Sequence, residues 1–386
     1  MSKEKTLSIR TMAVFVAMNF VLSMSGALFN AILDQVAVEL NISISQTGML
    51  SSFYAYGAGI GVPVFLVLFR KYDRTILLKV MLLCNIIATG LLLVVSNFPL
   101  LILARFLMGL CGNCYGVLAT ANISALSPKE RVGKNIATLI TGGASALMIG
   151  IPLTRALSHI LSWRIIFMML MALMILSLLY FVFFLPSIGK DTKPLNLKSE
   201  LAFFKDRQVV VQLLASFITF VGYGAFYMYM TPYIVGMFPQ LDGIMSVLLI
   251  FVGFCSFSGN LIGGILCDKL GYYKALMIGT MMQIITASLI LLTNSIMVVN
   301  IGLVLLWMML GWFIGLQINT GITIVTRNKS SLMISLNSSG IQLGQAIGAS
   351  IAAMIISSMG ISKIIICSIV CSIIVLLGLY INNKEF

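Results

Sequence analysis

Twelve apolar runs of roughly 20 residues follow one another along the chain, separated by short polar stretches. A helix needs about 20 residues to cross the roughly 30 Å hydrocarbon core of a bilayer. Of the 386 residues, 60% are hydrophobic and 9% are charged, whereas about 25% of the residues in a soluble domain are charged. Because a chain in lipid has to satisfy its own backbone hydrogen bonds, these runs predict an all-α polytopic membrane protein with 12 transmembrane helices.

The basic residues are distributed unevenly across the predicted membrane. If the N-terminus is cytoplasmic, all but four of the 24 Lys and Arg residues fall in the loops and tails of that side. The exceptions are Arg105, Arg155, Arg164 and Lys363. Such asymmetry predicts that both termini are cytoplasmic. Since it also explains the net charge of +13, we expect a lipid bilayer and no nucleic acid as partner.

A charged loop recurs about 200 residues apart. Its second copy occupies residues 263–274 and its first copy residues 61–74. An offset of 200 places Leu68 opposite Asp268, so the first copy lacks this acid, although Asp73 offers a substitute.

A stripe of small residues at every fourth position repeats at a similar distance. Its two copies are Gly142, Ala146 and Gly150, and Gly340, Gly344 and Gly348. Pro152 follows the first stripe and removes a backbone donor, which predicts a bend. Internal repeats of this kind build many membrane folds from two related halves. We therefore predict two pseudo-symmetric six-helix bundles, residues 1–186 and 208–386, joined by a cytoplasmic linker, residues 187–207.

The chemistry expected of an enzyme is missing from the sequence. No phosphate-binding loop is present, and His159 is the only histidine. The seven cysteines lie in or beside apolar runs, which indicates packing and not a metal or redox centre. We expect no catalytic residues, no metal and no cofactor.

Polar side chains inside the apolar runs are the candidates for a binding cavity. An arginine costs about 2.5–3.5 kcal/mol at the bilayer centre, so Arg105 either extends to the outer interface or faces the inside of the bundle. We favour the second interpretation. The other candidates, for which core packing is the alternative, are Asn19, Asn113, Tyr223, Tyr227, Trp312, Gln317, Asn337 and Gln342. The first predicted helix spans about residues 11–33, and a predicted outer loop after it carries Asp34 and Glu39.

Several of these motifs resemble those of the major facilitator superfamily. They are the duplicated loop, the segments 105–112 and 150–152, Trp163-Arg164, and the segment 337–344. The chain most resembles the twelve-helix drug and metabolite efflux branch, which includes arabinose-efflux-like permeases and bacterial purine efflux pumps. The resemblance covers essentially the whole chain. It implies a monomeric transporter of the bacterial inner membrane that works by alternating access, and in which Arg105→Ala abolishes transport while the protein still folds.

The same resemblance implies that the duplicated loop is a conformational latch. Its family motif falls on Gly264, Asp268, Lys269, Gly271 and Lys274 in the second copy, and on Gly61, Arg70, Asp73 and Arg74 in the first. Because the first copy lacks the acid, we expect Asp268→Asn to impair transport more than Asp73→Asn.

Coupling to protons is implied by the family, but no acid falls in the middle of a predicted helix. Gly26 stands where some relatives carry a glutamate. A cavity with an arginine and no carboxylate favours a small neutral, zwitterionic or anionic metabolite or drug. Three alternatives stay open: an importing symporter or facilitator of the same fold, a multidrug exporter of hydrophobic compounds, and a membrane sensor without transport.

Overall fold

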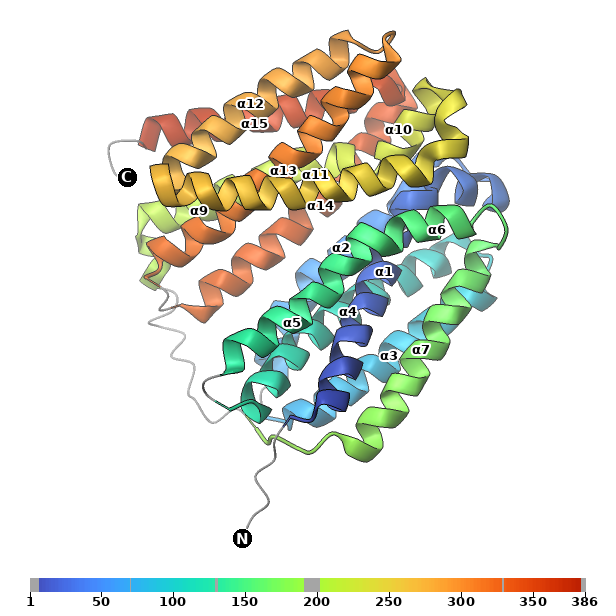
Figure 1. Cartoon of the computed structure of the whole chain (residues 1–386), viewed down its shortest axis with the longest axis vertical. Helices are drawn as coiled ribbons and strands as arrows, with labels where there is room; N and C mark the ends of the chain where they lie inside the picture. Colours follow the sequence, from blue (N-terminus) through green and yellow to red (C-terminus); the bar gives the residue numbers. More distant parts are fainter. Residues whose placement is uncertain (1–6, 70, 129–130, 191–201, 328–329, 383–386) are drawn as a thin grey trace. The chain divides into compact units, whose positions relative to one another are not determined.

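The computed structural model describes residues 7–69, 71–128, 131–190, 202–327 and 330–382. Within these residues every regular element is a helix and no strand occurs (Figure 1). The first seven helices are α1 (Ile9–Leu40), α2 (Ile44–Leu68), α3 (Arg74–Val94), α4 (Phe98–Leu126), α5 (Val132–Ser145), α6 (Ile151–Leu157) and α7 (Trp163–Phe184). The later ones are α9 (Arg207–Tyr227), α10 (Met230–Met237), α11 (Met245–Leu270), α12 (Tyr272–Leu292), α13 (Met297–Val325), α14 (Ser331–Met359) and α15 (Ile365–Asn382).

The predicted fold class, an all-helical polytopic membrane protein, is confirmed. In the described part of the chain, 11 helical segments are long and apolar enough to cross a membrane. The 25-residue helix α2 adds a further long helix in the expected place. Two of the crossing segments each join two α-helices, because α5 continues into α6 and α9 into α10.

The chain divides into two compact units. The first comprises Met1–Ile32 and Phe53–Lys193, and the second comprises Leu33–Ser52 and Pro194–Phe386. The division between Lys193 and Pro194 falls inside the predicted linker. The early segment of the second unit contacts the short stretch between α9 and α10, where the Tyr229 hydroxyl donates to the Ser45 carbonyl at 3.4 Å.

The prediction of a loop after residue 33 was wrong, because α1 continues to Leu40. Ile32 has non-helical dihedrals (φ −128°, ψ 21°), which bend the helix without ending it. Leu33, Val36 and Ala37 are buried. They follow the i, i+3, i+4 spacing of one helix face. The acids at 34 and 39 interrupt the apolar run, and so the sequence suggested a loop here.

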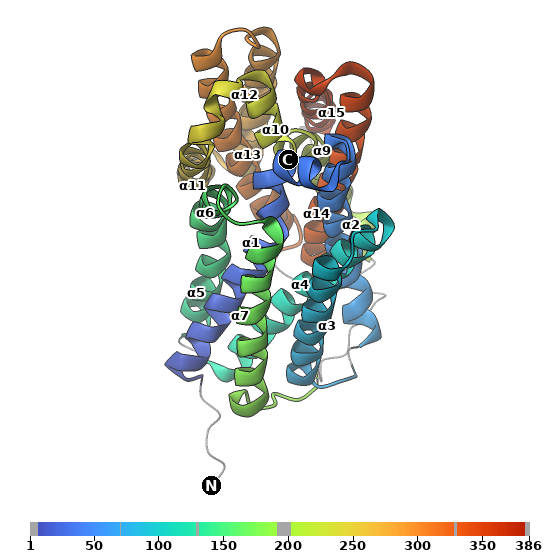
Figure 2. The ribbon, with the colours of Figure 1, turned by 90° about the vertical axis from the view of Figure 1, so that its right-hand side faces the viewer.

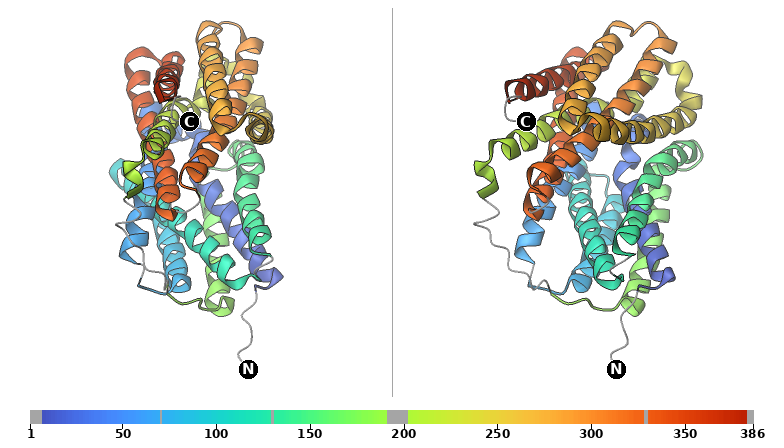
Figure 3. Two further views of the ribbon diagram at one scale, coloured as in Figure 1. Left: turned by 90° about the vertical axis from the view of Figure 1, so that its left-hand side faces the viewer. Right: turned by 60° about the vertical axis from the view of Figure 1, so that its left-hand side comes forward.

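In the first unit, α3 lies against both α4 and α7 (Figure 2). Its buried face includes Leu78, Leu82, Ala88 and Leu92. In the second unit, α12 lies against α13 and α15 (Figure 3). Ala275, Leu276, Ile314 and Leu379 form part of the core there. Since lipid is as apolar as these side chains, close van der Waals packing holds the helices together.

In each unit, one of the repeated glycines lies at a close contact between two helices. Gly142 of α5 lies against the backbone carbonyl of Val16 in α1, and Gly348 of α14 lies against that of Val221 in α9. A side chain at either position would displace a neighbouring helix. Gly344 packs on α9 as well, and a Cβ at Gly150 would lie 3.3 Å from the Met24 side chain, but Gly340 borders open space.

The helix irregularity predicted near Pro152 has a specific form. Residues Ala146–Gly150 make a π-helical turn, in which the Ile151 amide donates to the Ala146 carbonyl. Such turns absorb the break in hydrogen bonding that a proline causes, and they are frequent at functional sites.

Replacing Gly348 by valine is expected to destabilise the second unit by about 1–3 kcal/mol, the usual cost of overpacking. The matched control is Gly340→Val, two turns earlier on α14, where a Cβ meets no atom within 4 Å. Thermal unfolding of the purified protein in detergent measures both. An equal loss of stability in the two variants would contradict this account of the stripe.

Candidate functional site

The Asp73 carboxylate connects the start of α3 to the chain after α7. One of its oxygens accepts hydrogen bonds from the amides of Thr75 and Ile76, at 2.7 and 3.1 Å, and so caps the helix. Its other oxygen accepts from the Gly189 amide at 3.0 Å and from the Ser187 hydroxyl. The predicted substitute acid of the first loop therefore anchors the beginning of the predicted linker.

Neighbouring groups extend this anchor. The Thr75 hydroxyl donates to the side-chain carbonyl of Asn122 at 2.7 Å and accepts from the Ile188 amide at 3.2 Å. Burial raises the pKa of Asp73, but the hydrogen bonds from Ser187 and the three amides outweigh it, so the pKa lies below its usual value. A carboxyl whose pKa is lowered by folding stabilises the protein above its unfolded pKa, and this stabilisation is lost as the pH falls through the folded pKa.

The second copy of the loop is built differently. Only Gly271 separates α11 from α12, and its φ of +80° is a conformation that favours glycine. The first loop has the five residues 69–73 between α2 and α3. Counting from either helix end, Leu66 or Arg70 stands opposite Asp268, so the first copy lacks this acid in every register.

Asp268 lies exposed in the last turn of α11. Within the residues that the structure describes, its carboxylate makes no hydrogen bond or ion pair, and Lys269 and Lys274 are exposed beside it. Arg70, the corresponding base of the first copy, lies outside the described residues. The latch role of both loops stays a prediction.

We expect Asp73→Ala to lower the free energy of unfolding by about 0.5–2 kcal/mol, the cost of losing an acidic helix cap. Asp268→Ala is the matched control and should leave the unfolding temperature unchanged, because this carboxylate has no hydrogen bond to lose. Thermal melts of the two purified variants decide the point. A larger loss in Asp268→Ala than in Asp73→Ala would overturn it.

Arg105 is fully buried and joins three helices of the first unit. From α4 its guanidinium donates to the carbonyls of Ser25 and Gly26 in α1, each at 3.0 Å. It also lies 4.7 Å from the ring centres of Phe29 in α1 and Tyr54 in α2. Backbone dipoles and two ring faces thus compensate the charge.

Arg155 of α6 repeats this arrangement one turn further along α1. It is fully buried, and its guanidinium donates to the Ala31 carbonyl at 3.1 Å, next to the bend at Ile32. The two arginines therefore hold the part of α1 that precedes the bend. Contact between Arg105 and a solute would require these groups to rearrange, so that role stays a prediction.

The burial of Arg105 changes one expectation from the sequence. Arg105→Ala should lower the free energy of unfolding by about 2–5 kcal/mol, as large-to-small changes in packed cores do, instead of leaving the fold intact. Arg164→Ala is the control, because Arg164 lies near the start of α7 with its guanidinium 4.4 Å from the Trp163 ring. Melting curves of both variants test this, and a wild-type melt for Arg105→Ala would exclude a structural role.

Three of the predicted cavity residues form an aromatic cluster in the second unit. Tyr223 stacks on Tyr227, with ring centres 5.1 Å apart, and Trp312 lies close to the Tyr223 side chain. Trp307, which the prediction did not include, stacks on Tyr223 at 5.2 Å with an interplanar angle of 10°. Its ring nitrogen donates to the Ser368 hydroxyl at 3.3 Å.

The predicted amide side chains bond mainly to helix backbones. Asn19 donates to the Leu139 carbonyl at 2.8 Å, and Asn113 to the Gly109 carbonyl at 3.1 Å. The buried Gln317 donates to the Gly263 carbonyl at 2.9 Å. Asn337 donates to the side chain of Asn319 at 3.1 Å, and Gln342 is half-buried on α14. The bonds of Asn19, Gln317 and Asn337 join neighbouring helices, whereas that of Asn113 stays within α4.

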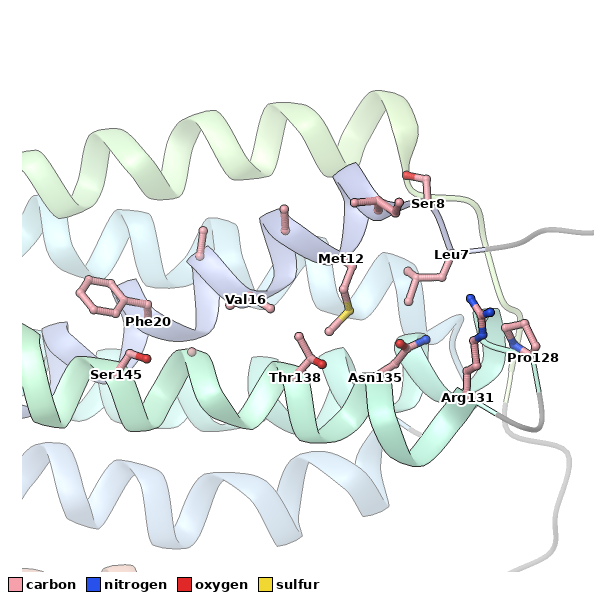
Figure 4. Close-up of a pocket in the computed structure, with 14 residues that line it drawn as sticks. Leu7, Ser8, Met12, Val16, Phe20, Pro128, Arg131, Asn135, Thr138 and Ser145 are labelled. Carbon is pink, nitrogen blue, oxygen red and sulfur yellow. The ribbon is translucent and has the colours of Figure 1, made fainter. Parts of the chain in front are cut away.

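A groove of about 890 Å³ lies between α1 and α5 in the first unit (Figure 4). Its lining comprises Leu7, Ser8, Ile9, Met12, Ala13, Val16, Ala17, Phe20, Pro128, Arg131, Asn135, Thr138, Gly142 and Ser145. Of the predicted cavity residues, none belongs to this lining. Arg131, Asn135, Thr138 and Ser145 follow helical spacing along α5, and this amphipathic stripe was the signal that could have revealed the groove.

A family model described as the Major Facilitator Superfamily matches residues 15–327. The MFS-type transporter YbcL of Bacillus subtilis (strain 168) is 26% identical over 351 residues, which cover 91% of this chain and 90% of that protein. A probable sugar efflux transporter of Pasteurella multocida (strain Pm70) is 24% identical over 249 residues, 62% of this chain and 61% of that protein. The crystal structure of the nucleoside transporter NupG has a TM-score of 0.75 at 13% identity, covering 96% of this chain and 99% of that one.

The helices and the family match together define a multi-pass membrane protein of a transporter class. The chain belongs to the Major Facilitator Superfamily. The resemblance to its efflux branch is confirmed, since the relatives include a sugar efflux transporter.

Proposed function

We propose that the chain is a secondary active transporter that exports a small neutral, zwitterionic or anionic metabolite or drug by alternating access. The observation that carries this proposal is the groove between α1 and α5, whose lining, among the residues that the structure describes, contains one cation, Arg131, and no carboxylate. Its volume of about 890 Å³ lies within the range of roughly 300–1,000 Å³ that is usual for small-molecule sites. A solute that is itself a cation would find no counter-charge there.

Export is supported by the relatives, which include a probable sugar efflux transporter. The membrane that fits the family match is the bacterial inner membrane, with both termini cytoplasmic and a monomer as the working unit. The loop at residues 263–274 serves as the latch between conformations. In this proposal Asp268→Asn slows transport more than Asp73→Asn, because Asp268 has no second, structural task.

Two driving forces are compatible with these residues. Antiport against protons is the rule suggested by the family, and it needs a group that binds and releases the proton. Alternatively the membrane potential, worth about 2.3 kcal/mol per charge per 100 mV, drives an anion out of a negative interior. The second force requires no carboxylate within the helices.

Purified protein in liposomes should release neutral, zwitterionic or anionic solutes and should not release ethidium-like cations. A pH gradient and a potential, imposed separately and in both directions, show which force accelerates release. Liposomes with the Asp268→Asn variant and liposomes without protein are the controls. Transport of cations alone contradicts the proposal, uptake in place of release favours the importer, and binding without flux favours a sensor.

The solute itself is best found by comparing the metabolites of cells with and without the gene. A compound that accumulates inside the cells lacking the gene, and decreases in their medium, is the expected substrate.

A further inference from the structure

The two walls of the groove differ in chemistry (Figure 4). The wall from α1 presents apolar side chains, among them Met12, Val16 and Phe20. The wall from α5 presents Asn135, Thr138 and Ser145. At a rise of 1.5 Å per residue, the apolar wall from Met12 to Phe20 is about 12 Å long. A ligand that fits has an apolar body of about this length.

The hydroxyl groups of Thr138 and Ser145 in the polar wall donate their hydrogens to backbone carbonyls of α5. Thr138 donates to the Lys134 carbonyl at 2.9 Å, and Ser145 donates to the Thr141 carbonyl at 2.7 Å. Each hydroxyl therefore turns lone pairs, and not a proton, towards the groove. A negative charge placed beside them would be repelled.

Arg131 is the charged residue of the lining and lies at one end of the groove, near Leu7 and Pro128 (Figure 4). Backbone and side-chain contacts fix this end. The Leu7 amide donates to the Leu126 carbonyl at 2.9 Å, and the Asn135 amide group donates to the Ser127 hydroxyl at 2.8 Å. The Arg131 amide donates to the Pro128 carbonyl at 2.9 Å, and its exposed side chain offers several N–H donors at this end, whereas the opposite end carries Phe20 and Ser145.

We infer that the groove between α1 and α5 binds a monocarboxylate with an apolar body, with the carboxylate on Arg131 and the body along Met12, Val16 and Phe20. A guanidinium binds a carboxylate through two parallel hydrogen bonds, which fixes the orientation of the ligand. This inference rests on the proposed function and narrows its substrate class to one of the three charge types. The groove volume corresponds to a drug-sized solute, and so the ligand is a free acid and not a phospholipid.

The test measures binding by calorimetry, with three probes of one shape: 4-phenylbutanoate, its uncharged amide, and 4-phenylbutylamine as the cation. For the wild-type protein in detergent, we expect the carboxylate to bind about tenfold more tightly than the amide, because its hydrogen bonds to arginine are charge-assisted. The cation should bind more weakly than both.

Arg131→Gln should weaken binding of the carboxylate about tenfold and leave the amide unchanged. Lys134→Gln, which removes an exposed charge one turn along α5 outside the groove lining, is the matched control and should bind as the wild type does. Ala17→Phe fills the groove and should weaken binding of both the carboxylate and the amide. Its control is Ala137→Phe, an exposed α5 position outside the lining. Thermal melts confirm that each variant is folded.

Equal binding of carboxylate and amide, or an equal effect of Arg131→Gln on both, would overturn the inference. So would displacement of the carboxylate by phosphatidylglycerol at equal concentration, since the site would then belong to lipid. Failure of the proposed function is a separate result. If the carboxylate binds as expected but no solute crosses the liposome membrane, the binding site stands and the proposed transport function fails. If neutral solutes cross the membrane but the carboxylate does not bind, the proposed function stands and this inference fails.

Discussion

The backbone carbonyls of α1 compensate the buried positive charges of the first unit. In lipid no water can do this, and the pairing of a guanidinium with carbonyl groups and ring faces replaces hydration. Arg105 and Arg155 approach α1 from α4 and α6 and bond to its residues 25, 26 and 31. Because the same helix forms the apolar wall of the groove with residues 9–20, the position of that wall depends on where the two arginines hold α1.

Most of the fold could be predicted from the sequence, because composition and periodicity report directly on lipid exposure. The long apolar runs indicated the helices, and the repeated glycines indicated the contacts of α5 with α1 and of α14 with α9. The prediction failed at residues 33–40, where two acids suggested a loop but Leu33, Val36 and Ala37 continue a buried helix face. Charge at a helix surface and charge in a loop look alike in one sequence.

The candidate site was harder to predict, since a polar side chain in the middle of a helix has two uses. Asn19 and Gln317 were chosen for polarity, and the structure shows both donating to backbone carbonyls of neighbouring helices. The groove runs instead along the contact between α1 and α5, where Val16 and Gly142 belong to its lining, and its charged residue lies at the start of α5. Its shape depends on the bulk of the side chains on both helices, which a search for polar positions does not take into account.

The charge of the inferred ligand bears on how transport is driven. An acid in the cavity of a transporter can bind a cationic solute, and the same acid can also take up and release protons. In a groove that binds a carboxylate, Arg131 provides the opposite charge. Arg131 cannot also exchange protons, because a guanidinium stays protonated. The solute then carries the mobile charge itself, and the membrane potential acts on it directly. Under the proposed function, the arginine at the end of the groove and the absence of an acid among the lining residues that the structure describes both favour an anionic solute.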